Sequence, residues 1–299
     1  MRSNWSMRVA AVLLFVSTTC SAQPPGGFGG GLGGGMEQPP PQLTRVTDDV
    51  YVIENANASI GELIANGGNA TVYLTDEGVV LFDTKFARVH DLLIQQVSSL
   101  TDKPVALVVL THHHADHSAG LPQLQADGAT TIISAADGET LKQQANSGSA
   151  QIAYSDSLLL TMGGKEIHLR EIQGHTQGDT IAWLPGARVL VAGDLVTTAD
   201  SIPVIVNYAD GGSWLALESA LDELAAYDFD YLIGGHGPVI SKSELLTFRQ
   251  KVSGIIARVR TLVRQGSDRE AIAAALLAEF NWGGGLATGN IPDMMQELK

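Results

Sequence analysis

Short apolar runs separated by polar turns recur along the chain from about Arg45 onward. Runs rich in Val, Ile, Leu and Tyr that end at Gly, Asp or Asn predict β-strands. The predicted strands cover residues 50–53, 71–74, 79–82, 105–110, 131–134, 166–172, 181–184 and 189–192. Asp76, Glu77 and Gly78 form the expected hairpin turn between the second and third of these strands. The run at 105–110 is apolar without interruption, which is typical of a strand covered on both faces.

Apolar residues at helical spacing predict helices at residues 87–100, 214–226, 241–263 and 268–280. Hairpins at the front and mixed strands and helices afterwards favour an α+β fold, in which sheets are sandwiched between helices. We expect one domain over residues 44–299.

The N-terminus has the pattern of a secretory signal peptide. Arg2 and Arg8 precede an apolar run at 9–16, and small residues follow up to Ala22. The run is too short to span a bilayer, which needs about 20 apolar residues. We therefore expect cleavage after residue 22, no stable membrane insertion afterwards, and a periplasmic or secreted protein. A retained anchor or a lipidated Cys20 is the alternative.

Residues 23–43 are rich in Gly and Pro, and we expect them to form a flexible linker. A docking arm is the alternative for this segment. Cys20 is the only cysteine, so cleavage would leave a chain without a disulfide or a thiolate ligand.

The net charge of the chain limits the classes of molecule that it is expected to bind. The chain has 18 Lys and Arg against 32 Asp and Glu, a net charge of −14. Loss of Arg2 and Arg8 with the signal peptide would bring the net charge to −16. Nucleic-acid-binding proteins concentrate basic residues on one face, and no basic cluster is present here. We expect a small-molecule substrate and no nucleic-acid partner; the oligomeric state is left open.

The first candidate functional residues follow directly after the apolar run at 105–110. Four ligand-type residues, His112, His114, Asp116 and His117, follow within a single loop. Imidazole nitrogens and carboxylate oxygens suit zinc. A solvated polar loop is the alternative, but a strand terminus gains nothing in packing from such a cluster.

Three later segments each place one ligand-type residue beside a glycine at the end of an apolar run. These residues are His175 in Gly174-His175, Asp194 in Gly193-Asp194 and His236 in Gly235-His236. Singly, each is weak evidence, since a lone histidine after a strand is more often structural. Together they form the only repeated pattern in the chain.

The combined motif resembles the H-x-H-x-D-H signature and the later ligand positions of the metallo-β-lactamase superfamily. The resemblance covers about Arg45 to the C-terminus and implies a four-layer αβ/βα sandwich with two metal ions at the edge between its sheets. It implies one metal held by His112, His114 and His175, a second held by Asp116, His117 and His236, and a bridging Asp194. The expected cofactors are two Zn²⁺, with Fe or Mn as other possibilities.

The same resemblance assigns supporting or neutral roles to other residues. Asp83 is expected to orient the ligands from behind rather than bind metal. His113 falls at a variable position and is expected to have no role in the site. His90 and His168 match nothing in the pattern and are expected at the surface.

Two segments are expected near the pocket. Residues 55–64 are rich in Asn and Gly and have an apolar tip, which suits a mobile flap. Residues 202–208 are too apolar for an ordinary exposed loop. They are expected either to pack under the C-terminal helices or to form a wall of the substrate site.

The ligands favour metal-assisted hydrolysis. Two divalent cations would lower the pKa of a shared water from ~15.7 toward ~7 and polarise the oxygen of the scissile bond. Asp116 would orient that water and pass a proton to the leaving group, so it is also the predicted catalytic residue. No serine or cysteine nucleophile is needed.

The substrate is left open between two readings. Asp at position 194 is similar to the glyoxalase, lactonase and phosphodiesterase branches, which favours an ester, lactone, thioester or amide. Zinc β-lactamases usually carry Cys or Ser there, yet export favours an exported class B-like β-lactamase.

Two further classes are weighed against the hydrolase. A mono-iron oxygenase on the same fold would use His112, His175 and Asp194, and the complete second ligand set disfavours it. A binding module with structural metals is disfavoured because structural zinc sites are closed by protein ligands.

Overall fold

The computed structural model describes residues 38–144 and 148–299. The predicted signal peptide, including Cys20, and most of the predicted linker lie outside these residues. The first strand starts at Gln42, two residues before the expected start of the domain. Residues 38–299 form one compact unit. No helix in the described part of the chain is long and apolar enough to cross a membrane.

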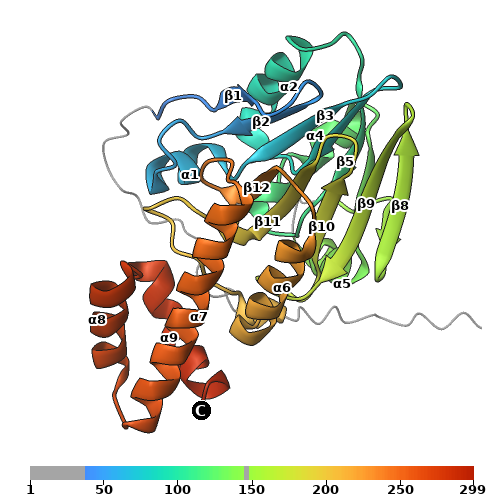
Figure 1. The fold of residues 1–299 in the computed structure, drawn as a ribbon. Coiled ribbons are helices and arrows are strands. Elements are labelled where there is room, and N and C mark those ends of the chain that lie inside the picture. Colours follow the sequence, from blue (N-terminus) through green and yellow to red (C-terminus); the bar gives the residue numbers. More distant parts are fainter. Residues whose placement is uncertain (1–37, 145–147) are drawn as a thin grey trace, which may run out of the picture. The chain divides into compact units, whose positions relative to one another are not determined.

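Two β-sheets form the centre of the domain (Figure 1). In the first sheet the strand order follows the sequence: β1 Gln42–Arg45, β2 Val50–Glu54, β3 Ala70–Leu74, β4 Val79–Phe82, β5 Val105–Val109, β6 Thr130–Ser134 and β7 Ile152–Tyr154. Strands β1 to β4 pair antiparallel, and β4 to β7 pair parallel. The expected hairpin joins β3 to β4, with Leu74 opposite Val79.

The second sheet has the order β12-β11-β10-β9-β8. Its strands are β8 Ser157–Met162, β9 Lys165–Ile172, β10 Asp179–Leu184, β11 Val189–Thr197 and β12 Tyr231–His236. Only the β11–β12 pair is parallel.

Most of the helices pack on the outer faces of the two sheets. They are α1 Ile60–Asn66, α2 His90–Ser98, α3 Ala115–Ser118, α4 Leu121–Ala126, α5 Ala135–Gln143, α6 Trp214–Ala226, α7 Lys242–Arg264, α8 Arg269–Phe280 and α9 Gly285–Glu297. Two short 3₁₀ turns, η1 Ala87–Val89 and η2 Tyr208–Asp210, complete the described elements.

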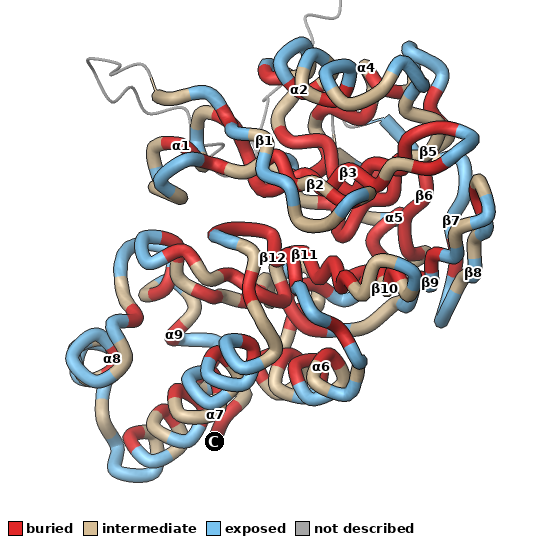
Figure 2. Tube along the Cα trace, turned by 45° about the horizontal axis from the view of Figure 1, so that its top comes forward, coloured by how far each residue is buried: buried red, intermediate tan, exposed pale blue. Residues whose placement is uncertain are grey.

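The buried side chains form three clusters that define four layers (Figure 2). One cluster fills the space between the sheets, with Phe82 from the first and Val191 from the second. A second joins the first sheet to α2 and α4 through side chains such as Leu93 and Leu124. The third joins the second sheet to α6 through α9. Burial on both faces of central strands such as β4 and β11 explains the long apolar runs, and the predicted αβ/βα sandwich is confirmed.

Two local expectations are wrong. Residues 55–64 are not wholly a loop, because α1 begins at Ile60. Ser59 accepts a hydrogen bond from the Glu62 backbone, and the Glu62 carboxylate accepts from the Ser59 backbone, which is a capping box. Asp194 does not follow a strand, since β11 continues to Thr197.

Candidate metal centre

The ligand-type residues converge from four segments of the sequence at one edge of the two sheets. The loop after β5 and the short helix α3 supply His112, His114, Asp116 and His117. His175 precedes β10, Asp194 lies within β11, and His236 is the last residue of β12. In the described residues they fall into two groups: His112, His114, His175 and Asp194; and Asp116, His117 and His236. His114 also belongs to a third group, with His113 and Asp210. The first two groups bring together the residues that the sequence assigns to the two metals, with the predicted bridge Asp194 in the first of them.

Two glycines make the approach of Asp194 possible. Gly193 has φ +51°, a left-handed conformation, and the register of β11 with β12 shifts on both sides of it. This irregularity turns Asp194 out of the ladder. A Cβ atom at Gly235 would lie 1.9 Å from Oδ1 of Asp194, so only glycine leaves room there.

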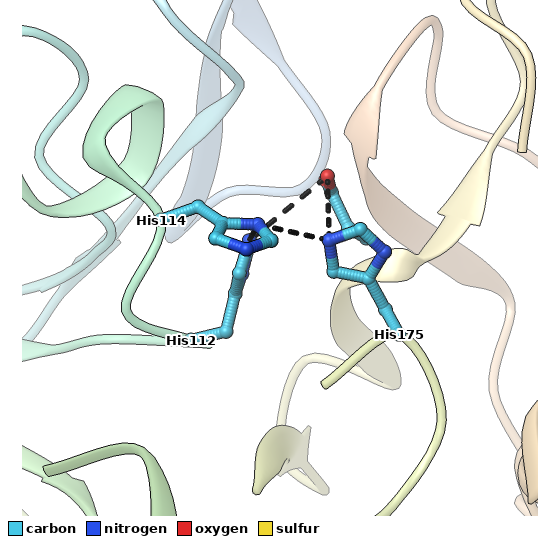
Figure 3. Close-up of side chains that lie close together, drawn as sticks. His112, His114 and His175 are labelled. Atoms are coloured by element: carbon cyan, nitrogen blue, oxygen red, sulfur yellow. Dashed lines mark hydrogen bonds and ion pairs between the residues drawn. The ribbon is translucent and has the colours of Figure 1, made fainter. Parts of the chain in front are cut away.

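In the first group, three imidazole nitrogens face one another (Figure 3). Nδ1 of His114 lies 3.1 Å from Nε2 of His112 and 3.0 Å from Nε2 of His175. Oδ2 of Asp194 lies 3.6 Å from the same His175 nitrogen.

Hydrogen bonds on the far side of each ring assign the tautomers. Nδ1 of His175 donates to the Ile205 carbonyl at 2.9 Å. Nδ1 of His112 lies 3.1 Å from Oγ1 of Thr111, whose own hydroxyl donates to Asp83. Nε2 of His114 lies 3.3 Å from a carboxylate oxygen of Asp210. The inward nitrogens of His112 and His175 therefore present lone pairs to the same point, and Nδ1 of His114 does so when its Nε2 donates to Asp210.

Lone pairs that meet at this distance repel one another unless a cation lies between them. A tetrahedral zinc with ligand distances of about 2.1 Å separates its ligand atoms by about 3.4 Å, close to the spacing seen here. Burial, with the neighbouring charges of Asp194 and His114 opposing each other, lowers the pKa of His175 to about 4. Burial and the neighbouring histidines hold the pKa of His112 well below its usual range. Both rings are therefore neutral at pH 7, which is the form that binds metals.

The second group shares one oxygen of Asp194. Oδ1 of Asp194 lies 3.2 Å from Nε2 of His117 and 3.3 Å from Nε2 of His236. Oδ2 of Asp116 lies 3.4 Å and 3.2 Å from the same two nitrogens. The side chain of Asp194 is 11% exposed, and its Oδ1 has no hydrogen-bond partner of suitable geometry among the described residues. An oxygen placed in this way fits a cation.

The carboxylates of the second group shift the pKa values of its histidines upward, opposite to the shifts in the first group. Burial opposes protonation of His236, but the carboxylates of Asp194 and Asp116 outweigh it and raise the pKa of His236 to about 9. Burial likewise opposes protonation of His117, yet Asp116, Asp194 and Asp83 raise its pKa well above the usual range. In the metal-free protein these carboxylates therefore hold both rings protonated, and a cation bound among them would take the place of those protons.

Asp83 lies behind the ligands, as the sequence predicts. Its Oδ2 accepts hydrogen bonds from Nδ1 of His117 at 2.8 Å and from Oγ1 of Thr111 at 2.7 Å. Its Oδ1 accepts from the Thr111 backbone at 2.7 Å. One carboxylate therefore orients His117 directly and His112 through Thr111.

His113 is placed differently from expectation. Its side chain is fully buried, with Nδ1 2.9 Å from Asp137 and Nε2 3.1 Å from Asp210. Asp210 in turn contacts His114, whose hydrogen bond is the main cause that lowers the pKa of Asp210 to about 2. His113 therefore belongs to the supporting structure of the first group.

Other residues that the sequence pattern did not single out also shape the site. Asp179 accepts hydrogen bonds from the backbone and the hydroxyl of Thr176, both at 2.9 Å, which fixes the turn after His175. Asp137 and Asp210 come from α5 and η2, and only the folded chain brings them to His113. An Asp after an apolar run is too common a signal to have identified them.

The remaining histidines lie away from the centre. His168 is 46% exposed and contacts Glu166, as expected of a surface residue. His90 is more buried than expected, with 13% exposure and an ion pair to Asp127 at 3.0 Å. The 202–208 segment packs under the C-terminal helices, because Val204 and Val206 are buried in the same cluster as Trp282 and Ile291.

Comparisons with known proteins show the family of this chain. The sequence model of the Metallo-beta-lactamase superfamily matches residues 63–236. A metallo-beta-lactamase type 2 from Bacillus cereus is 27% identical over 68% of this chain and 79% of its own length. A second from Elizabethkingia meningoseptica is 27% identical over 54% of this chain, and the match spans 65% of that protein. A hydroxyacylglutathione hydrolase from Rhodobacter capsulatus is 39% identical over 32% of this chain and 36% of its own length.

Solved structures share the fold. A metallo-beta-lactamase from Pontibacter korlensis superposes with a TM-score of 0.63 at 20% identity, over 71% of this chain and 99% of that protein. The sec-alkyl sulfatase PisA1 superposes with a TM-score of 0.66 at 17% identity, over 86% of this chain and 50% of that protein.

Proposed function

Because this chain belongs to the metallo-beta-lactamase superfamily, we propose that it is a binuclear zinc hydrolase that acts on an ester, lactone, thioester or amide. Family membership confirms the predicted enzyme class, a metal-dependent hydrolase. The metal count, the metal and the substrate class are the proposal.

The observation that carries the proposal is the position of Asp194 between the two histidine groups. Its Oδ2 faces His175 and its Oδ1 faces His117 and His236, so one carboxylate is able to serve both groups. His112, His114 and His175 would hold the first ion, and Asp116, His117 and His236 the second. When bound, two divalent cations supply an activated water nucleophile and Lewis-acid polarisation of the substrate.

The chain's own residues would position the reaction. Asp116 is 22% exposed, the most open of the second group, and its carboxylate is available to orient water and to carry a proton to the leaving group. Asp83 and Asp210 hold the outer faces of the histidine rings. The completeness of the second group argues against a mono-iron oxygenase, which needs only two histidines and one carboxylate.

A β-lactamase is the second candidate, and the relatives named metallo-beta-lactamase type 2 favour it. Asp at position 194, where zinc β-lactamases usually carry Cys or Ser, favours the first candidate, as does the short match to a hydroxyacylglutathione hydrolase. The −14 charge of the chain fits a small substrate better than a polyanion.

A hydrolysis screen tests the proposal. The purified chain is assayed on β-lactams, lactones, thioesters, esters and phosphodiesters. Two variants are assayed in parallel: His175→Ala removes one ligand of the first group, and His236→Ala removes one ligand of the second. We expect turnover of an ester, lactone, thioester or amide that both variants abolish, and weak β-lactam turnover at best. Efficient penicillin or carbapenem hydrolysis would replace the first candidate by the second.

We further propose that the enzyme is exported. The proposal is supported by the basic start, the apolar run at 9–16 and the small residues before position 23.

A further inference from the structure

The backbone and side chains of residues 205–210 touch two of the three histidines in the first group. The Ile205 carbonyl accepts the Nδ1 proton of His175 at 2.9 Å. On the other side, Nε2 of His114 lies 3.3 Å from Asp210 and 2.9 Å from the Asn207 amide. The Asn207 amide nitrogen is itself a donor and also donates to Asp210. The proton acceptors that face the outer nitrogens are therefore the Ile205 carbonyl and the Asp210 carboxylate, and through them this one segment fixes which nitrogen each ring presents to the centre.

The segment is held from behind by α9. The side-chain amide of Asn290 pairs with both backbone groups of Val206: its Nδ2 donates to the Val206 carbonyl at 3.0 Å, and its Oδ1 accepts from the Val206 amide at 3.1 Å. Oδ1 also accepts from Nε1 of Trp214 at 3.2 Å. Since Val206 is fully buried, its backbone groups have no access to water and depend on this side chain.

Glu297 makes the second attachment. One of its carboxylate oxygens accepts from the Tyr208 hydroxyl at 2.6 Å and from the Trp214 backbone at 3.2 Å. The other accepts from the Ser213 hydroxyl at 2.5 Å. Burial and the Glu297 carboxylate both raise the pKa of Tyr208, which keeps the hydroxyl in its donating form. Tyr208 lies two residues before Asp210, so this bond anchors the turn that carries the Asp210 carboxylate.

Helix α9 has features that separate it from the rest of the fold. It lies beyond residue 236, where the family match ends. It contains Gly285, Gly289 and Pro292, which disfavour helix, so its stability depends on packing rather than on propensity. Asn290 and Glu297 are seven residues apart and therefore share one face of the helix. Figure 1 shows α9 beside α7 at the end of the chain.

We propose that α9 is a positioning element of the first metal group, in which Asn290 and Glu297 fix residues 205–210 and thereby the orientation of His114 and His175. The inference rests on the proposed function, since it requires the first group to bind metal. Neither residue touches the centre, and both act through the segment between.

The test measures zinc affinity of each group separately by competition with a chromophoric chelator. His236→Ala removes a ligand of the second group, so zinc binding in this background reports on the first group. His175→Ala removes a ligand of the first group, so zinc binding in this background reports on the second group. Glu297→Ala and Asn290→Ala are introduced into both backgrounds. Glu279→Ala is the matched control, because Glu279 pairs with Arg258 between α8 and α7 and is far in sequence from residues 205–210.

We expect each α9 variant to weaken zinc binding about 10-fold in the His236→Ala background, the lower end of what outer partners of metal ligands contribute. Affinity in the His175→Ala background should stay within about twofold, and Glu279→Ala should leave both unchanged. Should an α9 variant fail to fold, Tyr208→Phe removes the same anchor from the other side and should weaken only the first group.

An equal loss in both backgrounds would overturn the inference and make α9 a general support of the domain. Unchanged affinity in both would overturn it as well. Failure of the proposed metal binding looks different, because the two background proteins would then bind no zinc at all. Failure of the proposed substrate class would leave these zinc affinities untouched.

Discussion

Oδ1 of Asp194 lies 3.3 Å from Nε2 of His236, although the two residues belong to neighbouring strands and Asp194 interrupts the ladder between them. The glycines at 193 and 235 allow this approach. Because the second oxygen of Asp194 faces His175, the carboxylate is placed to neutralise and to space two cations.

Replacement of Asp194 tests this placement. Asp194→Ala should lower occupancy of the second ion and reduce kcat by more than 100-fold, since changes to outer partners alone cost about 10–100-fold. KM should change far less. Asp194→Ser should lose activity on every substrate. Retained or improved β-lactam turnover by the Ser variant would instead support the β-lactamase candidate.

Replacement of the Asp83 carboxylate should weaken metal binding, because this carboxylate orients His117. In the wild type, one carboxylate oxygen of Asp83 accepts hydrogen bonds from both His117 and Thr111. Asp83→Asn replaces this carboxylate by a neutral amide. We expect metal affinity to fall by about 10–100-fold. Competition titration measures it, with Asp91→Asn, on the exposed side of α2, as the control. Equal affinities of the two variants would remove Asp83 from the supporting structure.

Lys85 should make stability depend on pH. Its side chain is fully buried and its ammonium group donates to the Gly68 carbonyl; burial lowers its pKa to about 7, although Asp116, Glu54 and Asp83 oppose the shift. In the unfolded chain the pKa of a lysine is about 10.4. Between these values the unfolded chain binds the extra proton, so stability rises with pH.

Urea unfolding of the metal-free protein at pH 7.5 and 9.5 measures this dependence. The wild type should gain up to about 1.4 kcal/mol for each pH unit relative to Lys85→Met, which has nothing to titrate at this position. Parallel pH profiles of the two proteins would show that Lys85 stays charged in the fold.

The N-terminus offers a test of export. Intact-mass measurement of protein recovered from outside the cytoplasm should give a chain that begins at Gln23. A mass that still includes Arg2 and Arg8 would show that the segment is retained.

Much of the fold was predictable because the central strands are buried on both faces. Runs such as 105–110 remain recognisable without knowledge of their neighbours. Helix α9 was not predicted, since Gly289 and Pro292 weaken the local signal and the packing of Ile291 and Met294 supplies the stability. In the same way, the capping box at Ser59 gave a local signal for α1 that the Asn- and Gly-rich composition obscured.

The ligand-type residues were predictable because four of them follow one apolar run within a single loop, and the other three each lie beside a glycine near the end of an apolar run. Their supporting partners were not. His113 reaches Asp137 and Asp210 only through contacts between α5, η2 and the loop after β5, and no spacing in the sequence records those distances.

The number of metal ions per chain tests the central claim most directly. Elemental analysis of wild type, Asp116→Ala, His175→Ala and the surface control His168→Ala is compared after equilibration with zinc and removal of the free metal. We predict two ions in the wild type and in the control, and one in each of the other two variants. A wild type with a single tightly bound ion, unchanged by Asp116→Ala, would contradict the binuclear centre.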